Sequence, residues 1–179
     1  MLLRDYLAAQ ARTWPERTAY VSGESRRTWG ETVDRVGRLS AALAALGVQQ
    51  GDVVATLGRD GLPTVEVWFG AATTGAIRTA INWRYSAREV EHILRDARVS
   101  ALVVEGGSPE ELLSQVDLTT LPDLRRIIGY GEHTQELDYE TLLAERAPLA
   151  PENWPNIGEE DAIAIHYTTG STGLPKGVV

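Results

Sequence analysis

A short stretch near the carboxyl end of the chain combines glycines, hydroxyl side chains and one ammonium group. It reads Tyr167-Thr168-Thr169-Gly170-Ser171-Thr172-Gly173-Leu174-Pro175-Lys176-Gly177. Glycines let a backbone approach an anion closely, and consecutive free N–H groups form concave anion sites. The hydroxyl groups can donate hydrogen bonds to phosphate oxygens, and Lys176, the only lysine of the chain, adds a mobile positive charge. The stretch suits a polyphosphate-binding loop, although such clusters are also typical of solvated turns.

The spacing of this loop differs from that of the common nucleotide-hydrolase loop. A Walker A loop reads G-x-x-x-x-G-K-[ST] and opens directly into a helix. Here Pro175 removes a backbone donor just before Lys176, and a glycine follows the lysine. The apolar run 162–167 before the loop and Val178-Val179 after it have strand character. We therefore predict a strand–loop–strand anion clamp, and a phosphate-loop hydrolase is the less favoured alternative.

The loop as a whole resembles the signature of the adenylate-forming (AMP-binding) superfamily, which includes acyl-CoA and aryl-CoA synthetases, nonribosomal adenylation domains and luciferases. The family usually has serine where Thr169 stands. It usually has a small residue followed by proline at the place of Thr79-Ala80, so this chain departs from the family pattern at that turn. Segments throughout the chain also resemble family motifs: T-W-G-E at 28–31, L-G-V-Q-Q-G-D-V-V at 46–54, the stretch 68–82, and the helix and strand at 89–104.

The resemblance implies a ligase that joins a carboxylic acid to ATP, releases pyrophosphate, and passes the acyl group to a thiol, commonly that of coenzyme A. Because the β and γ phosphates leave, they must be held, and the resemblance places them in the loop with Lys176 neutralising part of their charge. Mg²⁺ is implied as a further counter-charge. The predicted triphosphate-binding residues are Thr168, Thr169, Gly170, Ser171, Thr172, Gly173 and Lys176.

The resemblance also bears on domain organisation. It implies that residues 1–179 are the amino-terminal portion of an AMP-binding domain that ends just after the loop 167–177, with a connector at 148–161. The family's acyl pocket, its magnesium-binding glutamate and its carboxyl-terminal lid with a catalytic lysine would be absent. We therefore assign no catalytic residue and expect these residues alone to be inactive. The alternative is a non-catalytic truncated homologue that binds nucleotide or serves as a scaffold.

Composition excludes several other classes of protein. The net charge of −8 argues against nucleic acid as a partner, and the lack of cysteine excludes disulfides and thiolate metal sites. No run approaches the ~18 apolar residues of a membrane span. The amino terminus has no secretory pattern, so a cytoplasmic location is the default. A homodimer could form through apolar surface left exposed at the end of the chain.

Alternating patterns predict the fold. Helices are expected at 2–13, 28–46, 63–74, 86–97, from 108 and at 139–145, and strands at 18–22, 26–28, 52–57, 101–104, 126–129 and 162–167. Capping boxes are expected at Thr28/Glu31 and Ser86/Glu89, with another cap at Ser108. The alternation predicts an α/β fold: a layered, mostly parallel sheet with flanking helices. Ligands bind beyond the carboxyl ends of such strands, which is where the loop begins.

The histidines and one acidic cluster have ordinary structural explanations. His166 lies on an apolar strand and is interpreted as a structural histidine with satisfied hydrogen bonds, in preference to a catalytic base. His92 and His133 lack partners at metal-ligand spacing, so we expect no zinc site. Glu159-Glu160-Asp161 is interpreted as a solvated turn, with a cation site as the alternative.

Other conspicuous residues are given structural roles as well. Asp52 and Asp96 are interpreted as capping or turn residues. The segment Asn82-Trp83-Arg84 follows a strand end and could line a channel to the active site, although support of a turn explains Asn82 equally well. Three tryptophans are expected to lie in the core: Trp29, Trp68 and Trp83.

Overall fold

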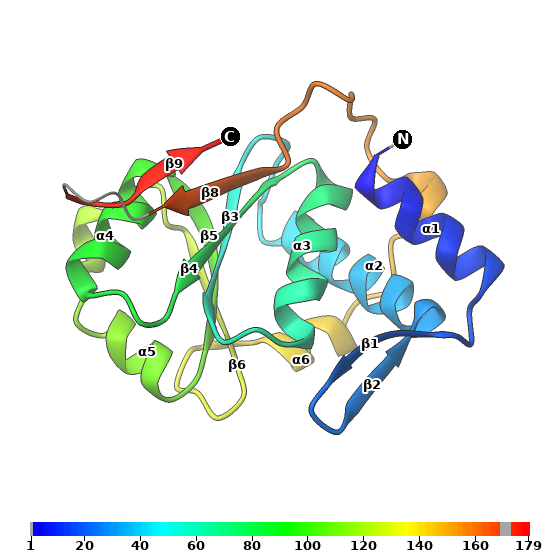
Figure 1. Ribbon diagram of the computed structural model, residues 1–179, viewed down its shortest axis with the longest axis horizontal. Coiled ribbons are helices and arrows are strands. Elements are labelled where there is room, and N and C mark those ends of the chain that lie inside the picture. Colours follow the sequence, from blue (N-terminus) through cyan, green and yellow to red (C-terminus); the bar gives the residue numbers. More distant parts are fainter. Residues whose placement is uncertain (1, 169–172) are drawn as a thin grey trace.

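The computed structural model describes residues 2–168 and 173–179 and is built on a seven-stranded sheet with the order β7-β6-β5-β3-β4-β8-β9 (Figure 1). Neighbouring strands are parallel except for β8 and β9, which are antiparallel. The predicted α/β class with a mostly parallel sheet is therefore confirmed. The strands are β3 Val53–Gly58, β4 Ile77–Asn82, β5 Val99–Glu105, β6 Arg126–Tyr130, β7 Leu137–Asp138, β8 Ala164–Thr168 and β9 Lys176–Val178.

Helices cover both faces of the sheet (Figure 1). One face packs against α2 Trp29–Ala45, α3 Leu62–Thr74 and α6 Tyr139–Ala144, with α1 Leu3–Thr13 lying outside α2 and α3. The other face packs against α4 Ala87–Asp96 and α5 Ser108–Leu113. A separate hairpin of β1 Thr18–Ser22 and β2 Ser25–Thr28 lies beside α2, and short 3₁₀ helices span Leu118–Thr120 and Pro151–Asn153. None of these helices is long and apolar enough to cross a membrane.

The central strand β5 shows why the strands are almost wholly apolar. Ala101 and Val103 pack toward α2 and α6, whereas Leu102 and Val104 pack toward α4 and α5. Because side chains alternate along a strand, a strand covered on both faces needs apolar residues at every position. This arrangement fixes the direction of the parallel strands and gathers their carboxyl ends along one edge.

Most local signals in the sequence are confirmed. In the first capping box the Glu31 N–H donates to Thr28 Oγ1 (3.2 Å) and the Thr28 N–H donates to Glu31 Oε2 (2.8 Å). The Ser86/Glu89 box is formed in the same way. The cap expected at Ser108 is wrong, because α5 begins after Gly107 with no side-chain cap.

The connector at 148–161 packs against the domain along its first half. The Leu149 N–H donates to the Gly37 carbonyl of α2 (3.0 Å), and the Trp154 indole donates to the Leu149 carbonyl (3.0 Å). The Arg4 guanidinium of α1 donates to the Pro155 carbonyl. A side chain at position 37 would collide with Leu149, since a Cβ there would lie 2.9 Å from its oxygen. The connector thus runs from α6 across the helices to β8, and these contacts hold it in place.

A charged cluster joins α2, α3 and α6 beneath the surface. Glu66, which is 2% exposed, accepts hydrogen bonds from Arg35 Nε (2.6 Å) and from the Tyr139 hydroxyl (2.8 Å). Arg35 also binds the exposed Glu140 with its two terminal nitrogens. Burial acts to lower the pKa of Arg35, but the two carboxylates outweigh it and raise the pKa. Burial and the Glu66 charge both raise the pKa of Tyr139, so its hydroxyl stays protonated and can donate.

We expect Glu66→Gln to lower the free energy of unfolding by about 3 kcal/mol, because it leaves a partly buried guanidinium and a buried hydroxyl without their shared carboxylate. The matched control is Glu140→Gln, which removes the other carboxylate on Arg35 at a position whose side chain is 62% exposed. That change should cost less than about 1 kcal/mol. Urea unfolding of both variants makes the comparison, and equal losses would contradict a central role for Glu66.

Candidate functional site

The strands that flank the polar loop in the sequence, β8 and β9, lie at one edge of the sheet, and α4 lies nearby (Figure 1). Thr168 is the last residue of β8 and is paired directly with Lys176, the first residue of β9. Directly paired residues project their side chains on the same face, so the hydroxyl and the ammonium group emerge together. Both residues are exposed, as is Gly173. The structure therefore contains both strands of the predicted strand–loop–strand arrangement.

Four of the seven predicted binding residues, Thr169, Gly170, Ser171 and Thr172, lie outside the described residues. The structure brings Thr168 and Lys176 together across the mouth of the loop. It also places the start of the loop at the carboxyl end of β8, which runs parallel to β4. The expected location beyond the carboxyl ends of the strands is thus confirmed, although binding by these residues stays a prediction.

Helix α4 holds the chain on both sides of the loop. The Tyr167 hydroxyl, just before the loop, donates to Asp96 Oδ2 (2.6 Å). His92 Nε2, one turn earlier on α4, donates to the Pro175 carbonyl just before Lys176 (2.9 Å). Burial raises the pKa of Tyr167, and its bond to Asp96 raises it further, so the phenol remains a donor. The prediction that Asp96 is a capping or turn residue is wrong, because its carboxylate receives this tertiary hydrogen bond.

Two further contacts fix β8 in the sheet. The Thr79 hydroxyl of β4 donates to the Ile165 carbonyl (2.9 Å), so the position at which this chain departs from the family pattern ties the two strands together. On the other side, a Cβ at Gly177 would lie 3.0 Å from Ile165 Cγ2 and 3.1 Å from Tyr167 Cζ. The glycine that ends the motif therefore permits close packing of β9 on β8.

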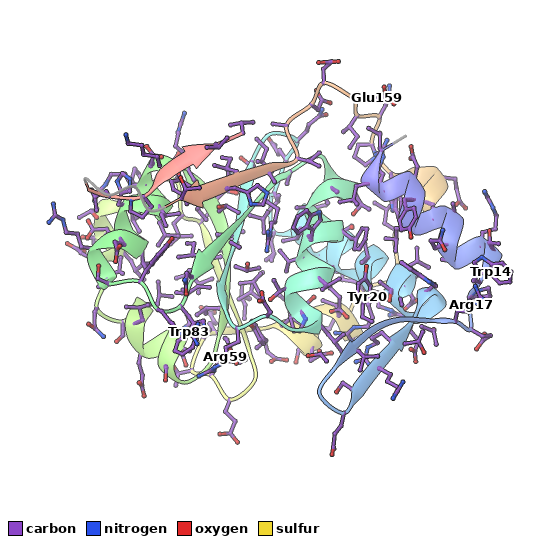
Figure 2. All side chains as sticks on the ribbon, in the orientation of Figure 1. Trp14, Arg17, Tyr20, Arg59, Trp83 and Glu159 are labelled. Atoms are coloured by element: carbon purple, nitrogen blue, oxygen red, sulfur yellow. The ribbon has the colours of Figure 1, made fainter. Side chains whose placement is uncertain are left out.

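A cavity of about 640 Å³ opens at the carboxyl ends of β3 and β4 and is bounded on one side by Tyr167. Its volume lies within the range of small-molecule sites. Trp83, in the turn after β4, is covered by two guanidinium groups, with Cζ of Arg59 at 4.6 Å and Cζ of Arg84 at 4.5 Å from a ring centroid. Figure 2 shows Arg59 beside Trp83. The cavity therefore presents two guanidinium groups and an aromatic surface together with the carboxylate of Asp60, and the stacked surface favours planar groups.

The residues of the predicted channel have distinct roles in this cavity. Asn82 Oδ1 accepts a hydrogen bond from the Arg84 N–H (3.0 Å), so Asn82 supports the turn. Asn82, Trp83 and Arg84 all line the cavity. Trp83 also packs against the core on the α4 side, as expected, and Trp29 packs against the core formed by α1, α2 and α3. Glu105 holds Arg59 through an ion pair of 3.0 Å.

A second aromatic and cationic cluster was missed by the sequence patterns. The half-buried Trp68 of α3 lies over the Arg78 guanidinium of β4, with Cζ 4.6 Å from a ring centroid, and does not join the apolar core. His166 of β8 lies beside the same indole, with centroids 6.1 Å apart. The interpretation of His166 as a satisfied structural residue is wrong, because it is exposed and its imidazole forms no hydrogen bond with any residue that the structure describes. An arginine in an otherwise uncharged strand was the available signal.

The remaining expected structural residues can be placed as well. His133 Nε2 donates to Asp138 Oδ2 (3.0 Å), which braces the turn before β7. Asp161 accepts a hydrogen bond from the Gly158 N–H (2.8 Å) within the turn predicted at 159–161. Asp52 accepts from the Gln49 N–H in a turn, as predicted, and forms an ion pair with Arg125 as well. Across residues 2–168 and 173–179, no three histidine or carboxylate side chains gather in a way that could hold a metal ion.

Comparison with known proteins agrees with this geometry. The family model for AMP-binding enzymes matches residues 7–179. A long-chain-fatty-acid–CoA ligase of Thermus thermophilus is 37% identical over 158 residues, which cover 86% of this chain and 28% of that protein. A peroxisomal butyrate–CoA ligase of Arabidopsis thaliana is 32% identical over 187 residues, which cover 97% of this chain and 33% of that protein.

A solved structure gives the same picture. The anthranilate CoA ligase AuaEII, in complex with anthranoyl-AMP, superposes with a TM-score of 0.92 at 28% identity over 99% of this chain and 34% of that one. The chain thus spans about a third of the length of the relatives it matches. With its glycine- and hydroxyl-rich loop at the edge of a parallel sheet and a family match over nearly its whole length, the chain belongs to the family of AMP-binding enzymes, and the relatives named here are CoA ligases.

Proposed function

We propose that this chain binds the triphosphate of ATP in a carboxylate–CoA ligase that forms an acyl-adenylate and then an acyl-CoA thioester. The observation that carries the proposal is the pairing of Thr168 with Lys176 at the mouth of the loop, with α4 holding both sides. A hydroxyl donor and an ammonium group on one face suit the oxygens of a polyphosphate. The family match and the CoA ligases among the relatives support the same activity.

In the first step a carboxylate oxygen of the acid attacks the α-phosphorus of ATP, and the bond to the β-phosphate oxygen breaks. Pyrophosphate leaves with the electrons of that bond. Lys176 would stabilise the growing negative charge of pyrophosphate, and the Thr168 hydroxyl would donate to one of its oxygens. Thr169, Gly170, Ser171, Thr172 and Gly173 complete the loop in this proposal. In the second step the thiol of coenzyme A attacks the acyl carbonyl carbon and AMP leaves.

Mg²⁺ is part of the proposal as a counter-charge for the phosphates. The described part of the chain has no carboxylate cluster that fits the ion. Mg²⁺ commonly binds through substrate phosphates and water with few protein ligands, so the lack of a cluster is compatible with nucleotide-borne metal.

The acid is proposed to be a small carboxylic acid, and the cavity at β3 and β4 offers room for the acid or the thiol. The names of the relatives range from butyrate to long-chain fatty acids and do not narrow the choice. A cytoplasmic location also stays a prediction, since some relatives are peroxisomal. The homodimer and the lack of a nucleic-acid partner likewise remain predictions.

We expect Lys176→Ala to weaken ATP binding by about 1.5–3 kcal/mol, because a hydrogen bond to a charged group is removed. Calorimetric titration of the chain with a non-hydrolysable ATP analogue measures the loss. Lys176→Arg should retain much of the affinity, and Arg26→Ala, at an exposed position in the β1–β2 hairpin, should leave it unchanged. Equal affinity of the Lys176→Ala variant and the parent chain would overturn the assignment.

We expect Tyr167→Phe to weaken ATP binding while costing only about 0.5–1.5 kcal/mol of stability, because a partly exposed hydrogen bond to Asp96 is lost. Hydrogen exchange at the amides of Gly177 and Val178 should become faster as β8 loosens. Tyr6→Phe is the control, since that hydroxyl is exposed and distant from the loop in sequence. Unchanged exchange and unchanged affinity in Tyr167→Phe would show that α4 does not position the loop.

We expect the 179-residue chain to form no acyl-adenylate from ATP and butyrate or benzoate, even where it binds ATP. Its only lysine is committed to the phosphates, and the second lysine that the family resemblance implies is not among its residues. Mass spectrometry for the mixed anhydride, together with a pyrophosphate assay, provides the measurement. Detection of the anhydride at levels above a protein-free control would refute this expectation.

A further inference from the structure

Arg78 is a buried cation without an acceptor. The residue is only 6% exposed, and it forms no ion pair or hydrogen bond through its side chain with any residue that the structure describes. Its Nε is fully enclosed without a partner. Buried charges in proteins are normally paired, because removing a charge from water is costly. Burial lowers the pKa of Arg78, but a guanidinium remains charged in proteins. The group therefore needs an anion.

Trp68 covers one face of the Arg78 guanidinium, and no described residue accepts a hydrogen bond from its Nε. Trp68 stacks on its face, with 4.6 Å between Cζ and a ring centroid, so the N–H groups in the plane of the guanidinium remain free to donate. His166 lies against the same indole and is exposed. Asp60 is the carboxylate whose charge acts on Arg78, yet the two do not form an ion pair. No residue that the structure describes therefore supplies the acceptor.

The register of the sheet connects this cluster to the cavity. Arg78 pairs with Ala164 of β8, so His166 projects from the same face two residues further along. On β4, the same face carries Ala80 and Asn82, which are exposed and line the cavity of about 640 Å³. Arg78 is the next residue of that row toward the interior of the sheet. A ligand in the cavity that extends along β4 would approach the guanidinium.

We propose that Arg78, stacked on Trp68 and flanked by His166, forms an oxyanion subsite that binds a carboxylate or phosphate group of a small-molecule ligand. A planar guanidinium matches two oxygens of either group, and the aromatic cover keeps water from competing. The subsite uses side chains other than those of Thr168 and Lys176, and Thr168 follows His166 on the same face of β8. The site follows from the geometry around Arg78, whereas the expectation that its ligand is the acid or the nucleotide rests on the proposed function.

The test uses the NMR signal of the Arg78 Nε–H group, which burial should protect from exchange with solvent. Comparison with Arg78→Met identifies the signal. The chain is titrated with butyrate, inorganic phosphate and AMP at constant ionic strength, with chloride as the reference salt. We expect a saturable shift of the Arg78 signal and of the Trp68 indole N–H signal. The indole signal should report affinity at least about tenfold weaker in Arg78→Met, because a charged hydrogen bond is lost.

The arms of the titration distinguish the sources of the anion. A response to butyrate alone assigns the subsite to the acid, and a response to phosphate and AMP assigns it to the nucleotide. Arg26→Met should bind as the parent chain does. If Arg78→Met fails to fold, Arg78→Lys replaces it, since the charge is kept and the planar pair of donors is lost. If none of the three anions shifts the signals, or if chloride shifts them equally, the proposed subsite is refuted.

The result of the Arg78 titration does not depend on the proposal that Lys176 binds a triphosphate. AMP, butyrate and phosphate lack the linked β and γ phosphates that Lys176 is proposed to hold. Loss of ATP-analogue binding in Lys176→Ala with an unchanged Arg78 titration would support both proposals. The Arg78 titration would still be informative if the loop proposal failed.

Discussion

The arrangement of this protein depends on the burial of a parallel sheet on both of its faces. Strands such as β5 carry apolar side chains on both faces, so helices must cover both sides to remove them from water. The crossover helices then force the strands to run in one direction. As a result, the carboxyl ends of β3, β4 and β8 lie along one edge, where the cavity is found and where Thr168 ends β8.

The loop depends on this framework through α4. That helix packs its apolar side against the sheet and uses two polar residues, His92 and Asp96, to hold the residues on either side of the loop. Neither residue is proposed to touch a ligand. The same helix thus contributes to the core and places Thr168 opposite Lys176, so fold stability and site geometry are coupled. The charged cluster around Glu66 braces the helices on the opposite face of the sheet in a comparable way.

Charge is distributed unevenly over the molecule. The chain carries a net charge of −8, yet Arg59, Arg78, Arg84 and Lys176 lie along the edge and face where ligands are proposed to bind. Three of these cations are stacked on tryptophans, which orients the groups and reduces the freedom they would lose on binding. A locally positive site on an acidic protein favours small anions over extended polyanions such as nucleic acid.

The sequence by itself determined the elements whose signals are local. Capping boxes, the glycine after α2 and the apolar runs of β3 and β5 predicted these elements to within a residue or two, because each depends on hydrogen bonds and periodicity within a short segment. The motif around Lys176 identified the family in the same way, because it too is a short local pattern. The tertiary structure alone decided the partners of Asp96, His92, Arg78 and His166. Their partners are distant along the chain, and strand register and helix packing bring such side chains together without leaving a pattern in the sequence around any one of them.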